Sequence, residues 1–303
     1  MATVPYGSWQ RSGQAVGSRR RWLKLAAVAV VGGAGAWMLV PGEPVAETGL
    51  AGVVSQAAAT SAKPLEAVQG VAALNRCREL LGTAEKKLAA IPTMSAVFQK
   101  QERVEGDLKP LSIMDLKVRH EPLSVYMKWQ QPDAGQELIW REGAFDGKIV
   151  VCPAGWRRKV MPMVKVDPHG DMAMAVSRRP ITNIGIWNFN KRLLETVNGD
   201  VTRDPSLQVS QSEGDEISGR PCYRFTFEHA QPSGQSPMQK MVIFYDRTLE
   251  VPVAFELYVW STGGGAPKGQ LEESYIFRDL KLDVALSESD FDHQNPAYAF
   301  TAK

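Results

Sequence analysis

The chain has 303 residues, of which 44% are hydrophobic, 8% aromatic and 22% charged, a composition that excludes disordered, fibrous and multi-spanning membrane proteins. Its 35 Lys and Arg residues nearly balance its 33 Asp and Glu residues, for a net charge of +2. No global basic field is available to attract nucleic acid, and we expect no nucleic-acid partner.

Residues 1–40 are predicted to be an export signal or a signal anchor. The apolar stretch 25–40 follows the basic run 19–24, and a positive region before an apolar core is the layout of a signal peptide. The string SRRRWLK at 18–24 resembles the twin-arginine pattern S-R-R-x-F-L-K, with Trp in place of Phe.

Cleavage of this segment and its retention as an inner-membrane anchor both stay open. The apolar core of about 16 residues is shorter than the ~20 that span a bilayer comfortably. No good cleavage site follows it closely, since 44–46 carries a proline and 55–57 lies far downstream. In either case we expect the rest of the chain to be exported to the periplasm.

Residues 41–63 are rich in Ala, Gly, Ser and Thr without periodicity, which predicts a flexible linker. A single folded domain is expected over 64–303. It starts with a predicted lid or packing helix over 64–91, because apolar residues recur there at steps of three and four: Leu74, Cys77, Leu81, Ala84 and Leu88.

After Pro92 the apolar period changes to two, which predicts successive strands joined by short turns. We expect about eleven strands, at 94–98, 114–118, 123–129, 138–140, 149–152, 156–161, 207–209, 223–227, 238–245, 253–259 and 275–284. The stretch 168–197 interrupts them and is predicted to hold an amphipathic helix over 184–194. An excursion of this length between strands is often a lid. This order gives a mainly β (α+β) fold, an antiparallel sheet so wide that it must curl.

Several spaced motifs resemble a known family. They are FQKQER at 98–103, KVRHEP at 117–122, the stretch 132–137, and RRPIT at 178–182 with Gly185. Over roughly residues 75–292 they resemble the bacterial envelope family catalogued as domain of unknown function 1571. More distantly, the F-x-Q strand, a D-G hairpin and IFYD at 243–246 look like the periplasmic lipoprotein carriers LolA and LolB. This resemblance implies a half-barrel with a helical lid that holds acyl chains or lipids in its concave face.

Local signatures of hydrolases, zinc proteases and nucleotide sites are absent from the sequence, so we expect no enzyme, no cofactor and no metal. His169 lies between two carboxylates, Asp167 and Asp171; a hydrolytic site there is the weakest alternative, and a polar turn is the simpler interpretation. Export permits a disulfide between Cys152 and Cys222, with Cys77 as a competing partner.

The predicted ligand-binding side chains are apolar and lie on alternating strands: Met127, Trp129, Trp140, Phe225, Phe227, Phe255 and Leu257. Most of them are expected to be core, and part of them to line an acyl-chain groove, where flexible Met and broad aromatic walls adapt to a variable ligand. An acyl chain gains ~0.8 kcal/mol per buried CH2, so a carrier needs no catalytic motif.

The densest basic run of the mature chain is Arg157, Arg158 and Lys159. We expect it to contact anionic lipid headgroups or an acidic partner, or to protect an exposed strand edge. The paired acids at 272–273 are expected to be solvated surface.

Together these features predict an exported, non-enzymatic protein that binds a lipid or acylated, lipoprotein-like ligand. The alternative is a membrane-anchored envelope sensor or structural module that contacts a protein partner.

Overall fold

The computed structural model describes residues 46–50, 53–56, 68–199, 204–232, 236–261 and 269–301. The predicted export segment 1–40 lies outside these residues. Within the described part of the chain, no helix combines the length and the hydropathy that crossing a bilayer requires.

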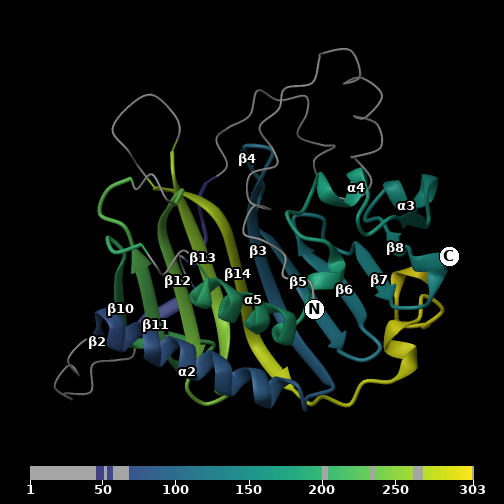
Figure 1. The fold of residues 1–303 in the computed structure, drawn as a ribbon. Coiled ribbons are helices and arrows are strands. Elements are labelled where there is room, and N and C mark those ends of the chain that lie inside the picture. Colours follow the sequence, from purple (N-terminus) through teal and green to yellow (C-terminus); the bar gives the residue numbers. More distant parts are fainter. Residues whose placement is uncertain are drawn as a thin grey trace.

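One curled antiparallel sheet of 14 strands forms the scaffold (Figure 1). The strands are β1 (Val54–Gln56), β2 (Val68–Gln69), β3 (Thr93–Val104), β4 (Asp107–Leu108), β5 (Ser112–Arg119), β6 (Ser124–Gln131), β7 (Glu137–Arg141), β8 (Ile149–Cys152), β9 (Val164–Val166), β10 (Gln208–Ile217), β11 (Arg220–Glu228), β12 (Met238–Asp246), β13 (Val251–Trp260) and β14 (Gly269–Leu282). Their order is β1-β10-β11-β12-β13-β14-β3-β5-β6-β7-β8-β9, with β2 beside β10 and β4 beside β3. The predicted mainly β fold with a curled antiparallel sheet is confirmed.

The strand predicted over 156–161 is wrong, because Arg157–Val160 form the short helix α3. The turn begins at Gly155, whose φ is +60°, and the amide of Met161 donates to the carbonyl of Arg157 at 2.8 Å. The apolar residues Trp156 and Val160 are four positions apart, a spacing that fits one helical turn as well as alternation. The basic run therefore lies on a helix, and its predicted role at a strand edge is also wrong.

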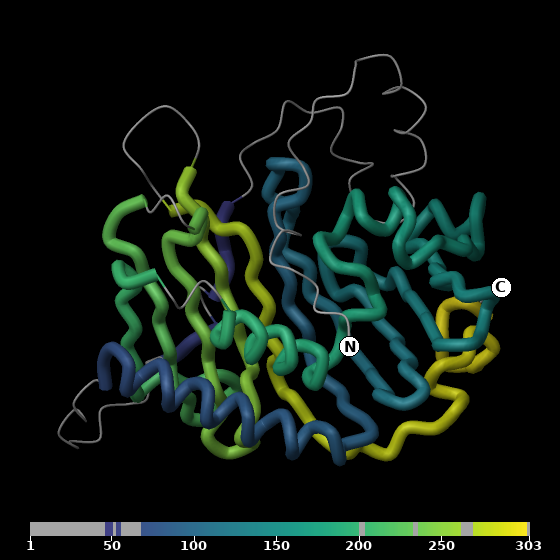
Figure 2. The backbone as a smooth tube through the Cα atoms, in the orientation of Figure 1, coloured from purple at the N-terminus to yellow at the C-terminus, as the bar shows by residue number. Residues whose placement is uncertain are grey.

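Two long helices lie against one face of the sheet, α2 (Gly70–Leu88) and α5 (Ile186–Asn198) (Figure 2). In α2 the apolar residues at steps of three and four are buried, as predicted: Ala73, Leu74, Cys77, Leu81, Ala84 and Leu88. They cover the strands from β10 to β13. The predicted helical lid is thus present, beginning at Gly70 rather than at 64.

Glu85 of α2 holds α5 in place. Its carboxylate accepts hydrogen bonds from Nε1 of Trp187 at 2.8 Å and from Nδ2 of Asn190 at 3.0 Å. Asn190 is fully buried, where a hydrogen bond to an ionised group is stronger than in water. The chain enters α5 through Gly185 at φ +102°, and a Cβ there would lie 3.3 Å from Cγ1 of Val118. Glycine therefore serves both the left-handed backbone and the close approach to β5.

The opposite face of the sheet is covered by the two ends of the described chain. Gln101 of β3, almost fully buried, accepts hydrogen bonds at Oε1 from the amides of Thr48 at 3.0 Å and Gly49 at 3.2 Å. Its Nε2 donates to the carbonyl of Ala46 at 2.9 Å. These described residues of the predicted linker 41–63 thus cross the sheet in hydrogen-bonded contact, and we call residues 46–50 the N-terminal strap.

The C-terminal residues cover the same face at β6 and β7. The rings of Tyr126 and Tyr298 stack with centroids 4.1 Å apart, and Phe291 and Ile139 are fully buried in the same small cluster. Successive residues of a strand point to opposite faces, so Met127, next to Tyr126, faces the helices instead.

We predict that Leu81→Ala lowers the free energy of unfolding by about 2–5 kcal/mol, because it removes buried volume between α2 and the sheet. Leu81 is 1% exposed. The matched control is Val71→Ala on the same helix, where the side chain is 72% exposed and a change within ~0.5 kcal/mol is expected. Denaturant unfolding of both variants checks this; equal losses would contradict the placement of α2.

Candidate functional site

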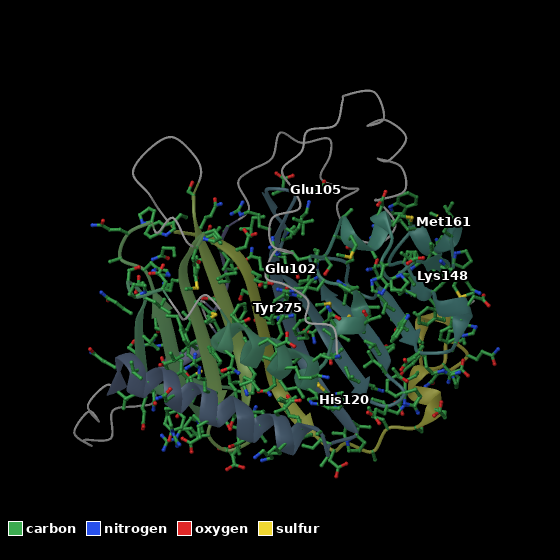
Figure 3. The ribbon with its side chains drawn as sticks, in the orientation of Figure 1. Glu102, Glu105, His120, Lys148, Met161 and Tyr275 are labelled. Carbon is green, nitrogen blue, oxygen red and sulfur yellow. The ribbon has the colours of Figure 1, made fainter. Side chains whose placement is uncertain are left out.

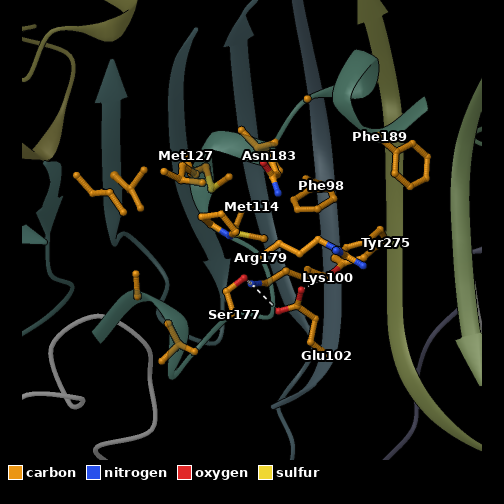
Figure 4. Close-up of a pocket in the computed structure, with 18 of the residues that line it drawn as sticks. Phe98, Lys100, Glu102, Met114, Met127, Ser177, Arg179, Asn183, Phe189 and Tyr275 are labelled. Atoms are coloured by element: carbon orange, nitrogen blue, oxygen red, sulfur yellow. Dashed lines mark hydrogen bonds and ion pairs between the residues drawn. The ribbon is translucent and has the colours of Figure 1, made fainter. Parts of the chain in front are cut away.

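A cavity opens between the sheet and the chain segment 173–192, which we call the cover (Figure 4). The cavity has a volume of about 120 Å³ and opens to solvent. The cover includes the second half of the helix α4 (Asp171–Met174), the single turn Ile181–Asn183 and the first half of α5. Its short elements place Ala173, Val176 and Ile181 over the cavity.

The floor of the cavity is apolar because cross-strand partners share a face. Phe98 of β3 is opposite Phe277 of β14 and Met114 of β5, and Met127 of β6 is opposite Leu138 of β7. All five line the cavity. Phe189 of α5 closes one side, its ring centroid 5.2 Å from that of Phe277. Methionine and aromatic rings together form a surface that adapts to apolar ligands.

The character of the cavity changes from apolar to charged along one strand. Phe98, Lys100 and Glu102 are alternate residues on the same face of β3 and all line the cavity. Nζ of Lys100 lies 3.1 Å from Oε2 of Glu102 and donates to Oγ of Ser177 in the cover at 3.0 Å. The hydroxyl of Tyr275 lies within hydrogen-bond distance of Glu102 and Glu273. Figure 3 shows Glu102 and Tyr275 close together, where β3 and β14 run side by side.

Glu273 is completely buried, so the expectation that the acids at 272–273 are solvated is wrong. Nη2 of Arg179 lies 3.0 Å and 3.2 Å from its two oxygens. Burial by itself would raise the pKa of Glu273, but the positive charges of Arg179, Arg192 and Arg178 outweigh it and lower the pKa. The carboxylate is therefore ionised although no water reaches it.

Arg178 holds the cover on the sheet. Its amide donates to Oε2 of Glu102 at 3.2 Å, its Nη1 donates to the carbonyl of Arg103 at 2.8 Å, and the same guanidinium pairs with Glu272. The motif RRPIT at 178–182 thus supplies two arginines whose partners lie on β3 and β14. The sequence showed this motif only as a family resemblance, because its partners are about 75–94 residues away along the chain.

The predicted apolar ligand residues divide between the cavity and the core. Met127 lines the cavity. Five others are buried in the main core, namely Trp140, Phe225, Phe227, Phe255 and Leu257, and Trp129 is half-buried against it. Phe255 packs edge-on against Phe189 of the cavity wall, with centroids 6.5 Å apart. Contact of this set with a ligand stays a prediction.

Exposed apolar side chains surround α3. The described residues include six large apolar side chains that are exposed, and four of them lie within 156–163: Trp156 at 74%, Val160 at 70%, Met161 at 40% and Met163 at 45%. We call these four the α3 patch. Arg157 pairs with Asp133, Arg158 donates to the carbonyls of Pro153 and Gly135, and Lys159 is exposed.

The other reactive side chains that the sequence singled out are His169 and the three cysteines. His169 is exposed, and its amide donates to Oδ1 of Asp167, whose other oxygen lies 2.8 Å from Nζ of Lys148. Among the described residues, no group of three His, Cys, Asp or Glu could hold a metal. Cys77, Cys152 and Cys222 are free and buried, and burial raises the pKa of Cys77 to about 12. This pKa leaves the thiol protonated and unreactive at neutral pH.

The fold and the site define a curled antiparallel sheet with a cavity under a helical cover. The chain matches the family described as "protein of unknown function (DUF1571)" over residues 91–300, more than two thirds of its length. It therefore belongs to the DUF1571 family, as its motifs predicted. Among curated proteins, none matches the chain.

Solved structures with a similar fold include three envelope proteins. The lipoprotein LppX of Mycobacterium tuberculosis is 9% identical, with 72% of this chain and 99% of that chain covered and a TM-score of 0.41. A putative outer membrane lipoprotein-sorting protein domain from Vibrio parahaemolyticus is 11% identical, covering 72% and 97%, with a TM-score of 0.33. A LolA superfamily protein from Nitrosomonas europaea is 9% identical, covering 71% and 97%, with a TM-score of 0.29. At these values the similarity concerns the fold alone.

We predict that Glu273→Gln destabilises the protein by roughly 3 kcal/mol at neutral pH, because Arg179 then lacks its buried anion. Since the pKa of Glu273 is lowered in the folded state, its contribution is complete above pH ~4.5 and is lost as the pH falls through the lowered pKa. The free energy of unfolding of the wild type should thus fall more steeply on acidification than that of the variant.

The control for this prediction is Glu288→Gln, which changes an exposed carboxylate paired with Arg119 and Arg141. Exposed pairs contribute little, so a smaller loss is expected. Denaturant unfolding at pH 7, 5, 4 and 3 measures both variants. Parallel pH profiles for wild type and Glu273→Gln would contradict an ionised Glu273.

Proposed function

We propose that this protein is an exported, non-enzymatic binding protein that holds a lipid or acylated ligand in the cavity under the cover. The observation that carries this proposal is the floor of the cavity, where Phe98, Met114, Met127, Leu138 and Phe277 form one apolar surface next to an open mouth. Each methylene moved from water onto such a surface gains about 0.8 kcal/mol. An acyl chain can therefore bind usefully without any catalytic group.

The attachment of the cover suits the exchange of such a ligand. Between Ala175 and Gly185 the cover has no helix longer than the single turn Ile181–Asn183. Hydrogen bonds from Lys100 and from the amide of Arg178, together with the Arg178–Glu272 and Arg179–Glu273 ion pairs, hold it on β3 and β14. The buried Arg179–Glu273 pair is costly to break, so a ligand would exchange through movement of the cover that leaves this pair in place. Movement of the rest of the segment would widen the cavity without unfolding α2 or the sheet.

We further propose that the α3 patch contacts a membrane with anionic lipids. Tryptophan and methionine side chains partition into the interface between headgroups and acyl chains. The basic residues Arg157, Arg158 and Lys159 carry more positive charge than the single Asp133 beside them removes, which favours anionic headgroups. α3 lies beside α4 at one end of the molecule (Figure 1), so contact there would bring the cover close to the lipid.

The N-terminal signal pattern supports export to the periplasm and, if uncleaved, an inner-membrane anchor.

We predict that Ala173→Phe weakens ligand binding about tenfold, because its ring fills space that about two methylenes of a ligand would otherwise occupy. The chain recovered from cell envelopes is extracted with organic solvent for mass spectrometry, and its affinity for a fluorescent fatty acid is titrated. Val71→Phe on the exposed side of α2 adds the same ring as a control. No extracted lipid and no fatty-acid binding in the wild type would refute the proposed function.

We predict that Trp156 enters the bilayer interface. Its emission, obtained as the difference between wild type and Trp156→Phe, should be quenched by vesicles of brominated phosphatidylcholine and phosphatidylglycerol. The quenching should fall when phosphatidylglycerol is left out or salt is raised, because screening weakens the attraction. The difference for Trp129→Phe, which reports a half-buried ring, is the control. An unquenched Trp156 would contradict the membrane contact, whatever the N-terminal segment does.

A further inference from the structure

Arg192 of α5 presents a guanidinium to the cavity at its charged end. The residue lines the cavity, and its Cζ lies 5.6 Å from the ring centroid of Phe189 and 5.2 Å from that of Tyr275. The side chain is thus held between two aromatic rings, at the border between the apolar floor and the ionic groups.

The charges around Arg192 do not balance. Arg178 pairs with Glu272, Arg179 with Glu273, and Lys100 with Glu102. A further cation, Arg103, lies 4.0 Å from Glu272 and 3.7 Å from Glu47, and none of the ion pairs among the described residues includes Arg192. Five cations therefore meet four carboxylates, and the positive charge left over, that of Arg192, faces the cavity.

Two features of the site oppose the positive charge of Arg192. Burial lowers the pKa of Arg192, and the neighbouring positive charge of Arg179 lowers it further. The carboxylates Glu273 and Glu102 oppose this shift from a distance. A bound anion would supply the missing charge, and the planar guanidinium fits a carboxylate or phosphate with two parallel hydrogen bonds.

We propose that the ligand is an amphiphile with an anionic oxygen headgroup, a carboxylate or a phosphate ester, that pairs with Arg192 while its acyl chain lies on the apolar floor. This inference rests on the proposed function. The two parts of the site are close enough for one molecule, since Phe98 and Lys100 are alternate residues of β3, about 7 Å apart. A short headgroup directly on the chain fits this spacing.

The test compares four ligands of one chain length at about pH 8. Dodecanoate, dodecyl phosphate, dodecanol and methyl dodecanoate compete with a neutral fluorescent probe for the full chain. We expect at least one anion to bind about tenfold or more tightly than the two neutral ligands. Whichever anion binds more tightly identifies the headgroup. Equal affinities for dodecanoate, dodecyl phosphate and dodecanol would overturn the inference while leaving the proposed function intact, whereas no binding by any of the four would refute both.

Variants at positions 192 and 191 show whether Arg192 recognises the anionic headgroup or only supports folding. Arg192→Met should remove the preference for anions and leave dodecanol binding unchanged, and Arg192→Lys should keep part of the preference because it keeps the charge. Lys191→Met, the neighbouring residue whose Nζ lies over the ring of Trp187, makes the same change in net charge and should keep the full preference.

The unfolding temperature without ligand shows whether each variant is folded. Burial opposes the charge of Arg192, but that charge also helps to keep Glu273 ionised, so its removal has opposing effects on stability and the binding comparison decides the inference. A preference for anions that survives in a folded Arg192→Met would overturn the inference. If Arg192→Met does not fold, the comparison of the four ligands on the wild type still decides it.

Discussion

The pairing of β14 with β3 determines how the rest of the molecule is built. It joins the strands that precede the cover in the sequence to those that follow it, and its register places Phe277 opposite Phe98, Tyr275 opposite Lys100 and Glu273 opposite Glu102. Two carboxylates directly opposite each other on a buried face repel. This point therefore needs cations: Lys100 of β3 pairs with Glu102, and Arg179 of the cover pairs with Glu273. The same register that creates the apolar floor thus also determines where the cover binds.

Different kinds of interaction stabilise the two halves of the sheet. Apolar packing of α2 and the second half of α5 holds the strands from β10 to β13, where Leu81, Leu193, Phe225 and Phe227 are fully buried. Over the other half of the sheet, ion pairs and hydrogen bonds hold the cover, and the apolar side chains beneath the cover line the cavity. Stability and ligand binding can therefore vary separately, since the residues that carry the core are largely not those that line the cavity.

Periodicity in the sequence predicts most of this fold but only part of the site. The alternation that marks Phe98, Met127 or Phe255 as inward-facing is local, so the long strands and α2 were found where they lie. The strands β1, β2, β4 and β9 have two or three residues each, too few to show a period, and α3 fits a strand or a helix equally. Glu273 looked solvated because the arginine that neutralises it is 94 residues away. Alternation also does not distinguish Phe225, whose side chain is buried in the core, from Met127, whose side chain lines the cavity.

The N-terminal strap limits where an export leader can be removed. Cleavage after 57 would separate the folded domain from residues 46–50 and from β1. Gln101 and Glu256, both nearly buried on the face opposite the cavity, would then lose the backbone amides of Thr48, Gly49 and Leu50, and unsatisfied buried polar groups are costly. A leader that ends before residue 46 keeps these bonds. If the predicted leader is cleaved, processing and folding of the chain would depend on each other, because residues 46–50 are bound to the sheet.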